Sequence, residues 1–195
     1  MTLLTLYIPR EGVRIKLIQI MLEEHKMIDE MLDLLDLSVT KAKEPPGLSA
    51  GIMAKELDFC KNFVNKCHEV KEEEILAPEL HRHGYPVDRG PILDMLEDHK
   101  KGRAILRRLL ATEKTVRAEE RQQSFAEMAA AYTLFLYGHM REEEDHLYKR
   151  ADLAIEASRQ EELDADCRKF DEAKLGKDSR QRYLKLIEEV RSALD

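Results

Sequence analysis

The sequence has no tryptophan, and its 195 residues include only 8 glycines, 6 prolines and 3 cysteines. An odd number of cysteines without a secretory signal argues against a disulfide framework and favours a reducing, cytoplasmic location. Glycine and proline, which break helices, are scarce, whereas the good helix formers leucine, glutamate, lysine, arginine and alanine dominate. The composition therefore predicts an all-α protein.

The sequence also lacks a long apolar segment and a block of positive charge. The apolar start, Met1–Ile8, is followed at once by Pro9 and Arg10. It is too short for a membrane span and has neither a basic leader nor a cleavage site, so we expect residues 1–13 to be an N-terminal extension. The 32 basic residues are scattered among 39 acidic ones, and the net charge is −7. Neither a membrane nor a nucleic acid is an expected partner.

Helical apolar periodicity recurs in four long stretches before residue 158. They are expected over residues 14–39, 49–81, 91 to before about 120, and from about 119–124 to 157. Connections with proline and glycine, such as Glu44–Gly47 and Gly84–Pro86, separate them. Four long helices with short connections predict one antiparallel, up-down four-helix bundle over residues 14–157.

Residues 158–195 continue with two shorter helical stretches. An acidic stretch covers residues 159–172, Leu175 and Gly176 break the pattern, and an amphipathic helix over residues 179–194 follows. We expect this C-terminal segment to pack on the bundle as extra helices and to brace it.

An internal repeat is the most informative feature of the sequence. The segment Leu22–Lys26, which reads LEEHK, returns as Leu96–Lys100, which reads LEDHK. The pattern His-x-x-x-Glu at residues 68–72 returns at residues 139–143. Each half of the repeat therefore supplies one histidine, followed 43 or 40 residues later by a His-x-x-x-Glu pair.

These residue types at this spacing are suited to a metal site. Positions four apart on a helix differ by about 40° and one turn, so both members of each His-Glu pair can point inward. The interior of a helical bundle is a usual place for metal sites built from facing helices. Four imidazoles and two carboxylates suit two metal ions, and this mixed set of nitrogen and oxygen donors accepts iron, manganese or zinc.

The arrangement resembles the hemerythrin-like, or HHE cation-binding, family over most of the chain. The resemblance implies a hemerythrin-like bundle around a non-haem di-iron centre with an oxo or hydroxo bridge. Such centres bind or react with dioxygen and related small molecules. Carried over residue by residue, the implied metal ligands are His25, His68, His99 and His139 as terminal donors, with Glu72 and Glu143 as bridges. We predict no other cofactor and no separate catalytic residue.

Two positions differ from the oxygen-carrying members of that family. By the same resemblance, the carriers have a fifth histidine one turn after the histidine of the third helix, where this sequence has Arg103. They also have an aspartate five residues after the last histidine, where this sequence has Glu144, with Glu143 just before it. Reversible oxygen transport is therefore not the expected function.

Several neighbouring residues admit two interpretations. Tyr132 and His146 each lie seven positions from His139 and return to nearly the same helix face, which makes them candidates for hydrogen bonding around the metals. A core tyrosine and a surface histidine are the simpler interpretations. The glutamate runs at residues 72–74 and 142–144 are interpreted as one inward-facing ligand each, with the other two glutamates in solvent.

The leading functional hypothesis is a cytoplasmic di-iron protein that binds dioxygen, nitric oxide or iron for sensing, storage or protection against oxidative and nitrosative stress. An enzyme that reduces peroxide or nitric oxide is the first alternative. A helical adaptor that the metal only stabilises is the second. Imidazole-rich ligation favours binding over oxidation chemistry, because neutral ligands stabilise highly oxidised iron less well than carboxylates do.

Overall fold

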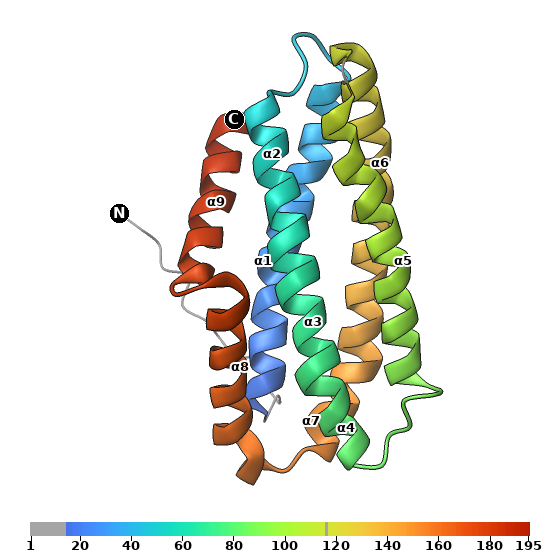
Figure 1. The fold of residues 1–195 in the computed structure, drawn as a ribbon, viewed down its shortest axis with the longest axis vertical. Helices are drawn as coiled ribbons and strands as arrows, with labels where there is room; N and C mark the ends of the chain where they lie inside the picture. The colour runs from blue at the N-terminus through green and yellow to red at the C-terminus, as the bar shows by residue number, and fades with distance from the viewer. Residues whose placement is uncertain (1–14, 116) are drawn as a thin grey trace.

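The computed structural model describes residues 15–115 and 117–195, and every regular element in this part of the chain is helical (Figure 1). The predicted all-α fold class is therefore confirmed. The N-terminal extension predicted for residues 1–13 lies outside the described residues. Among the described helices, none is both long and apolar enough to cross a membrane.

Four long helices form the bundle, and successive helices run in opposite directions (Figure 1). The first is α1 (Lys16–Ala42), and the third is α5 (Pro91–Ala111), which ends in the turn η3 (Thr112–Lys114). The second helix runs without a break through α2 (Ala50–Asp58), η1 (Phe59–His68), α3 (Glu69–Lys71), η2 (Glu72–Leu76) and α4 (Ala77–Arg82). The fourth runs through α6 (Ala118–Glu142), η4 (Glu143–Leu147) and α7 (Tyr148–Ala154).

Local sequence signals fix the ends of these helices. The side chain of Ser49 accepts a hydrogen bond from the Ile52 N–H and caps α2, at the position where the predicted stretch 49–81 begins. Pro91 occupies the first turn of α5, where its missing N–H costs nothing. Gly90 precedes it with a φ of 70°, a conformation that other residues adopt only with strain. The second helix continues past Pro78 to Arg82.

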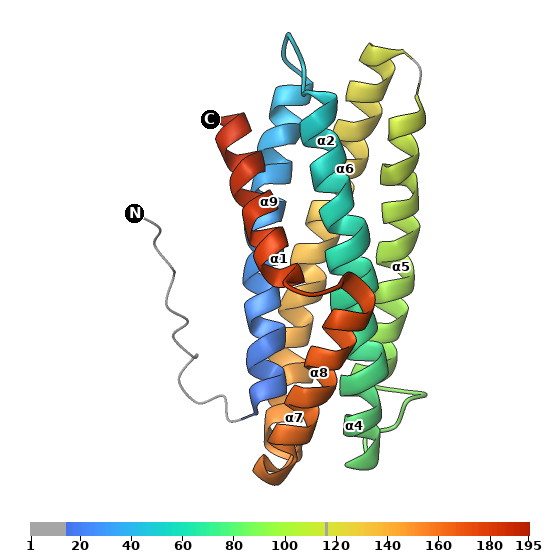
Figure 2. The ribbon, with the colours of Figure 1, turned by 60° about the vertical axis from the view of Figure 1, so that its left-hand side comes forward.

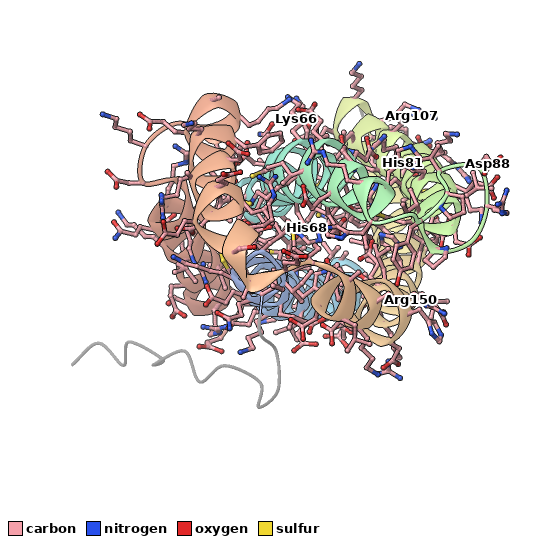
Figure 3. The ribbon with its side chains drawn as sticks, turned by 90° about the horizontal axis from the view of Figure 1, so that it is seen from below. Lys66, His68, His81, Asp88, Arg107 and Arg150 are labelled. Atoms are coloured by element: carbon pink, nitrogen blue, oxygen red, sulfur yellow. The ribbon has the colours of Figure 1, made fainter. Side chains whose placement is uncertain are left out.

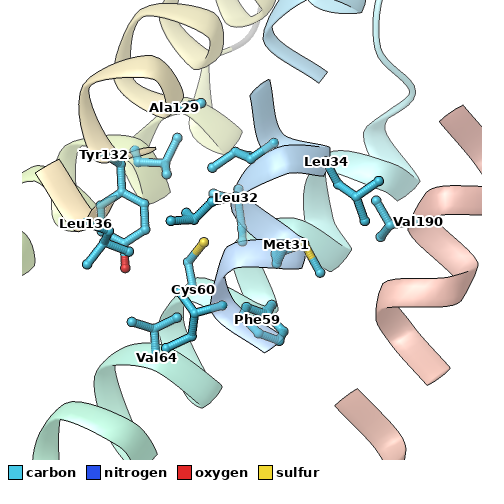
Figure 4. Close-up of a cluster of buried hydrophobic side chains, with 14 of the residues drawn as sticks. Met31, Leu32, Leu34, Phe59, Cys60, Val64, Ala129, Tyr132, Leu136 and Val190 are labelled. Carbon is cyan, nitrogen blue, oxygen red and sulfur yellow. The ribbon is translucent and has the colours of Figure 1, made fainter. Parts of the chain in front are cut away.

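Two apolar clusters fill the bundle, one towards each end, and a polar band separates them. The nearest members of the two clusters are Leu22 and Met27 on α1, Val64 and Leu76 on the second helix, Met95 and Leu106 on α5, and Leu147 and Met140 on the fourth helix. The larger cluster includes Leu32, Cys60, Tyr132 and Leu136, which face one another between three helices (Figure 4). The band between the clusters contains the predicted metal ligands.

The C-terminal segment contributes two further helices on one side of the bundle. After the short turn η5 (Ala157–Arg159), α8 (Gln160–Leu175) and α9 (Ser179–Leu194) run along α1 and the second helix (Figure 2). Gly176, with a φ of 83°, allows the bend between them. The ring of Tyr183 packs against Phe59 and Phe63, so α9 extends the larger apolar cluster.

Candidate metal centre

All six predicted metal ligands converge in the band between the two clusters. α1 supplies His25, the second helix His68 and Glu72, α5 His99, and the fourth helix His139 and Glu143. Their exposed fractions range from 0% to 5%. Seen along the bundle, His68 points into the space that the helices enclose, whereas Arg150 lies at the outer edge (Figure 3). The pseudo-repeat thus brings its six ligand-type residues together in the interior.

The first group of donors contains His25, His68, Glu72 and Glu143. The Nε2 atoms of His25 and His68 are 3.1 Å apart, and Glu143 Oε2 lies 3.4 Å from His25 Nε2. Glu72 Oε2 lies 3.7 Å from His68 Nε2. One donor atom from each of the four residues falls within 4.8 Å of all the others, which is the spacing that one bound cation requires.

The second group contains His99, His139 and again Glu143. Glu143 Oε1 lies 3.1 Å from His139 Nε2 and 3.5 Å from His99 Nε2. Glu143 therefore turns one carboxylate oxygen towards each group, which is the arrangement of a bridging carboxylate. Glu72 Oε2 also lies 3.2 Å from His99 Nε2, so it too stands between the groups.

The hydrogen-bonding pattern of these residues fits two cations. Five buried ligand atoms have no hydrogen-bond partner among the described residues: Glu72 Oε2, His99 Nε2, His139 Nε2 and both carboxylate oxygens of Glu143. A buried polar atom left without a partner costs about 1–3 kcal/mol. Atoms that carry lone pairs and converge on common points are satisfied by metal ions, so the residues present fit a pair of them.

π-helical turns carry three of the six ligands. His68 ends η1, Glu72 begins η2 and Glu143 begins η4, and each of these segments is a π-helix. Such turns insert an extra residue into an α-helix and are frequent at functional sites. Each π-helical turn rotates the residues after it about the helix axis. Residues before and after such a turn on the second and fourth helices therefore do not point to the centre at the spacing of a regular α-helix. Apolar periodicity, which assumes regular α-helix, did not reveal these turns.

A ring of carboxylates surrounds the four histidines. The Nδ1 atom of each histidine faces an acidic residue that adjoins a ligand on the next helix: Glu24 for His68 at 2.9 Å, Glu73 for His99 at 2.7 Å, Glu144 for His25 at 3.1 Å and Asp98 for His139 at 3.9 Å. Such contacts orient a metal-binding imidazole and raise its basicity. Glu73 and Glu144 therefore hydrogen bond to ligands, contrary to the interpretation that they face solvent.

Two cations pair with two members of this carboxylate ring, Glu24 and Glu73. The fully buried Lys71 pairs with Glu24 and, at 2.7 Å, with Asp171 from α8. Arg103, which stands where the oxygen carriers have a fifth histidine, pairs with Glu73 and with Glu69. Arg103 is therefore not a further metal ligand. It pairs with Glu73, which in turn contacts the Nδ1 atom of His99. Sequence reasoning did not assign these contacts of Lys71 and Asp171, because the partners lie on different helices.

The charged groups of the centre shift each other's pKa values. Burial alone would lower the pKa of His25, but the nearby carboxylate of Glu143 and the hydrogen bond with Glu144 outweigh it and raise the pKa to about 9. Burial would also lower the pKa of His99, but the surrounding glutamates outweigh it and raise the pKa to about 12. At His139 burial is the stronger effect, and the pKa is lowered. Burial opposes the charge on Glu143, yet the nearby imidazoles hold its pKa well below the usual range. The centre therefore favours positive charge, and a metal ion competes with protons for it.

A tyrosine that the sequence did not single out also reaches the centre. The Tyr148 hydroxyl donates a hydrogen bond to Glu72 and lies 3.0 Å from His25 Nε2. The two residues predicted for such contacts lie elsewhere. Tyr132 belongs to the larger apolar cluster (Figure 4), and its hydroxyl has no hydrogen-bond partner among the described residues. His146 is more than half exposed and pairs with Glu142.

A cavity of about 480 Å³ leads to the second group of donors. His139 and Glu143 form part of its wall. The rest of the wall combines apolar and polar residues from α5 and the fourth helix: Gly90, Pro91, Asp94, Met95, Asp98, Glu142, His146, Leu147 and Arg150. His25 and His68 do not line this cavity, so it approaches only one side of the centre.

Comparison with known families adds to this geometry. The family described as the hemerythrin HHE cation binding domain matches residues 16–151. The chain belongs to this family. The predicted resemblance is therefore confirmed, and the hemerythrin HHE domain is a cation-binding one, in agreement with the two donor groups. A search of curated proteins and a search of solved structures each gave no significant match.

Proposed function

We propose that this hemerythrin HHE domain holds two iron ions side by side and binds dioxygen or nitric oxide at the ion nearest the cavity. One observation carries the proposal: the second donor group consists of two imidazoles and a carboxylate, and it borders a cavity. Two histidines and one carboxylate with open positions are the ligand set of non-haem ferrous centres that react with oxygen. Manganese and zinc are the competing metals that the experiment below distinguishes.

Both donor groups would coordinate the two ions, and the glutamates would contribute to both. Glu143 offers one oxygen to each group, and Glu72 Oε2 lies between His68 and His99. These two carboxylates offset about half of the charge of two ferrous ions, which lowers the cost of burying them. When bound, iron supplies electrons and coordination positions for a diatomic ligand.

The residues of the cavity suit a small ligand. Met95 and Leu147 belong to the smaller apolar cluster and make part of the cavity wall apolar. Asp98 faces His139 from the same wall, with its Oδ2 atom 3.9 Å from His139 Nδ1. His146 and Arg150 line the wall as well, where their N–H groups can hydrogen bond to a polar ligand on its way in.

The test starts from protein purified without chelators and reconstituted with ferrous iron under anaerobic conditions. We expect about two irons per chain, a number set by the two donor groups. We also expect near-ultraviolet charge-transfer bands that appear on exposure to air, and a different spectrum with nitric oxide. Zinc, or no metal after reconstitution, would contradict the proposal and favour the metal-stabilised adaptor. Sustained consumption of peroxide or nitric oxide would make the protein an enzyme.

The exposed His146 provides a matched control for the ligands. His146→Ala removes an imidazole that lies at the cavity but outside both donor groups. We expect it to leave the iron content unchanged, whereas His139→Ala removes a donor of the second group. Equal iron loss in the two variants would show that the imidazoles bind iron non-specifically.

A further inference from the structure

Tyr148 breaks the symmetry between the two halves of the centre. The π-helical segments η2 and η4 are equivalent in the repeat, because each begins at the bridging-type glutamate and spans five residues. In each, the N–H of the next residue bonds to the glutamate carbonyl. That next residue is Ala77 in the second helix and Tyr148 in the fourth. Only one half of the repeat therefore places a hydroxyl at this position.

The π-helical turn explains why this hydroxyl reaches the ligands. Tyr148 lies five residues after Glu143, a spacing that regular α-helix directs away from the same face. Within a π-helix, residues five apart are joined by a hydrogen bond and lie above one another. Tyr148 is therefore buried, with 2% of its surface exposed, and its ring packs against that of His25.

The position of the hydroxyl oxygen matches that of a metal donor. Nitrogen and oxygen donors lie about 2.0–2.2 Å from metal ions such as zinc, and two donors at right angles around one ion are then about 3 Å apart. His25 Nε2 lies 3.1 Å from His68 Nε2 and 3.4 Å from Glu143 Oε2. It lies 3.0 Å from the Tyr148 oxygen. The hydroxyl oxygen therefore lies about as far from His25 Nε2 as the donor atoms of His68 and Glu143 do.

We infer that Tyr148 is a seventh protein ligand, whose phenolate oxygen binds the ion held by His25 and His68 when that ion is ferric iron. The inference rests on the proposed di-iron function. Phenolate is an established protein ligand of iron. An oxidant, dioxygen or ferricyanide, takes one electron from the ferrous ion. The O–H bond of Tyr148 then breaks as the Fe–O bond forms, and the proton passes to water.

The alternative role is positional, because the hydroxyl also donates a hydrogen bond to Glu72. In that case it orients the carboxylate without touching the ion. The two roles differ in their spectra: a ferric ion bound to phenolate absorbs visible light by charge transfer from the ring, and excitation in that band enhances the ring vibrations in resonance Raman spectra. A hydrogen bond to a carboxylate produces neither signal.

The experiment compares the full-length wild type with Tyr148→Phe and Tyr132→Phe. Tyr132 is a matched control, because it is equally buried on the same long helix and lies in the apolar cluster. Each protein is loaded anaerobically with ferrous iron, its iron content is measured, and it is oxidised with ferricyanide. We expect the wild type and Tyr132→Phe to show the phenolate band and ring vibrations, and Tyr148→Phe to lose both while it retains its iron.

Each result decides the inference. An iron-loaded, oxidised wild type without the phenolate band would overturn it and leave the di-iron proposal standing. A band that persists in Tyr148→Phe would also overturn it. Failure of the wild type to take up iron would remove both proposals together. The wild-type spectrum remains decisive if Tyr148→Phe does not fold, which its circular dichroism would show.

Discussion

The half of the centre around His25 and His68 differs from the half around His99 and His139, although one repeat builds both. The first half lies beside α8, whose Asp171 pairs with the buried Lys71, and the Tyr148 hydroxyl contacts it. The second half borders a cavity of about 480 Å³. The repeat thus sets the ligand-type residues, and their surroundings decide which donor group contains residues that line this cavity and which histidines are kept from it.

If the centre holds two ions, as we propose, this difference would give them different roles. An enclosed ion with many protein donors keeps its coordination, whereas an ion beside a cavity can exchange ligands. Structural metal sites have closed coordination and reactive ones keep an open position. Here the two donor groups share Glu143, so the proposed function would place one site of each kind side by side. Three predictions test whether the halves are as different as their surroundings, and one more concerns a buried group outside both.

The largest effect is expected when each half loses one ligand. His68→Ala combined with His139→Ala leaves one imidazole in each donor group. We expect iron affinity to fall by more than about 100-fold, beyond what the loss of an outer hydrogen-bonding partner causes. Helix content measured by circular dichroism should stay largely intact, because the two apolar clusters remain. Unchanged metal content in the double variant would rule out this ligand assignment.

The next effect concerns the cations that support each half. Lys71→Met leaves the buried Glu24 without its main partner, which costs about 3–5 kcal/mol, as for other broken buried ion pairs. Arg103→Met removes a partly exposed cation that pairs with Glu73 and with the buried Glu69, and should cost less, about 1–3 kcal/mol. Urea unfolding of the metal-free variants measures both. Equal losses would mean that the two halves are enclosed to the same degree.

The third prediction concerns a buried carboxyl group outside both halves, that of Glu56, which should make the free energy of unfolding depend on pH. Burial raises the pKa of Glu56 from 4.5 to about 8, although Ser38 donates a hydrogen bond to it. A raised folded-state pKa contributes stability that is complete below pH 4.5 and is lost as the pH rises to about 8. Glu56→Gln should therefore gain about 2–4 kcal/mol relative to wild type between pH 4.5 and pH 9.

Urea unfolding of the metal-free proteins at these two pH values measures this gain. Glu188→Gln, which changes an exposed glutamate of α9, is the control and should show no such trend. A stability difference between Glu56→Gln and wild type that does not vary with pH would mean that Glu56 is ionised in the fold.

The smallest effect compares two outer carboxylates. Glu144 lies 3.1 Å from His25 Nδ1 in the enclosed half, whereas Asp98 lies 3.9 Å from His139 Nδ1 in the accessible half. Glu144→Gln should weaken iron binding by about 10-fold, the lower range for such partners. Asp98→Asn should change it by about 3-fold or less, because a contact of this length is too long for a direct hydrogen bond. The reverse order would show that Asp98 moves closer when iron is bound.

Much of the fold followed from sequence because its signals are local. Apolar periodicity located the four long helices and the two C-terminal ones, and residues such as Ser49 and Pro91 marked where helices begin. The six ligand-type residues were found because the repeat placed them at the same helical register. The number of cysteines, by contrast, predicted only a reducing environment and no position in the fold. The structure shows all three as free and buried.

The contacts around the ligands could not be predicted in the same way. Tyr132 and His146 were chosen because seven residues make two α-helical turns, but the π-helical turn at η4 brings Tyr148 to the centre instead. Glu73 and Glu144 were interpreted as solvated members of glutamate runs, and Glu24 was not singled out. Their role depends on which helix lies next to each of them, and the sequence of one helix does not show which helix will pack against it.

The sequence by itself determined the helices, the family and the six residues suited to binding metal, because each of these depends on spacing along the chain. Only the tertiary structure decided which half of the centre is enclosed. Packing of α8 against the second helix and the rotation at η4 bring Asp171 and Tyr148 to one side, and the gap between α5 and the fourth helix leaves a cavity on the other. These outcomes depend on contacts between residues far apart in the sequence.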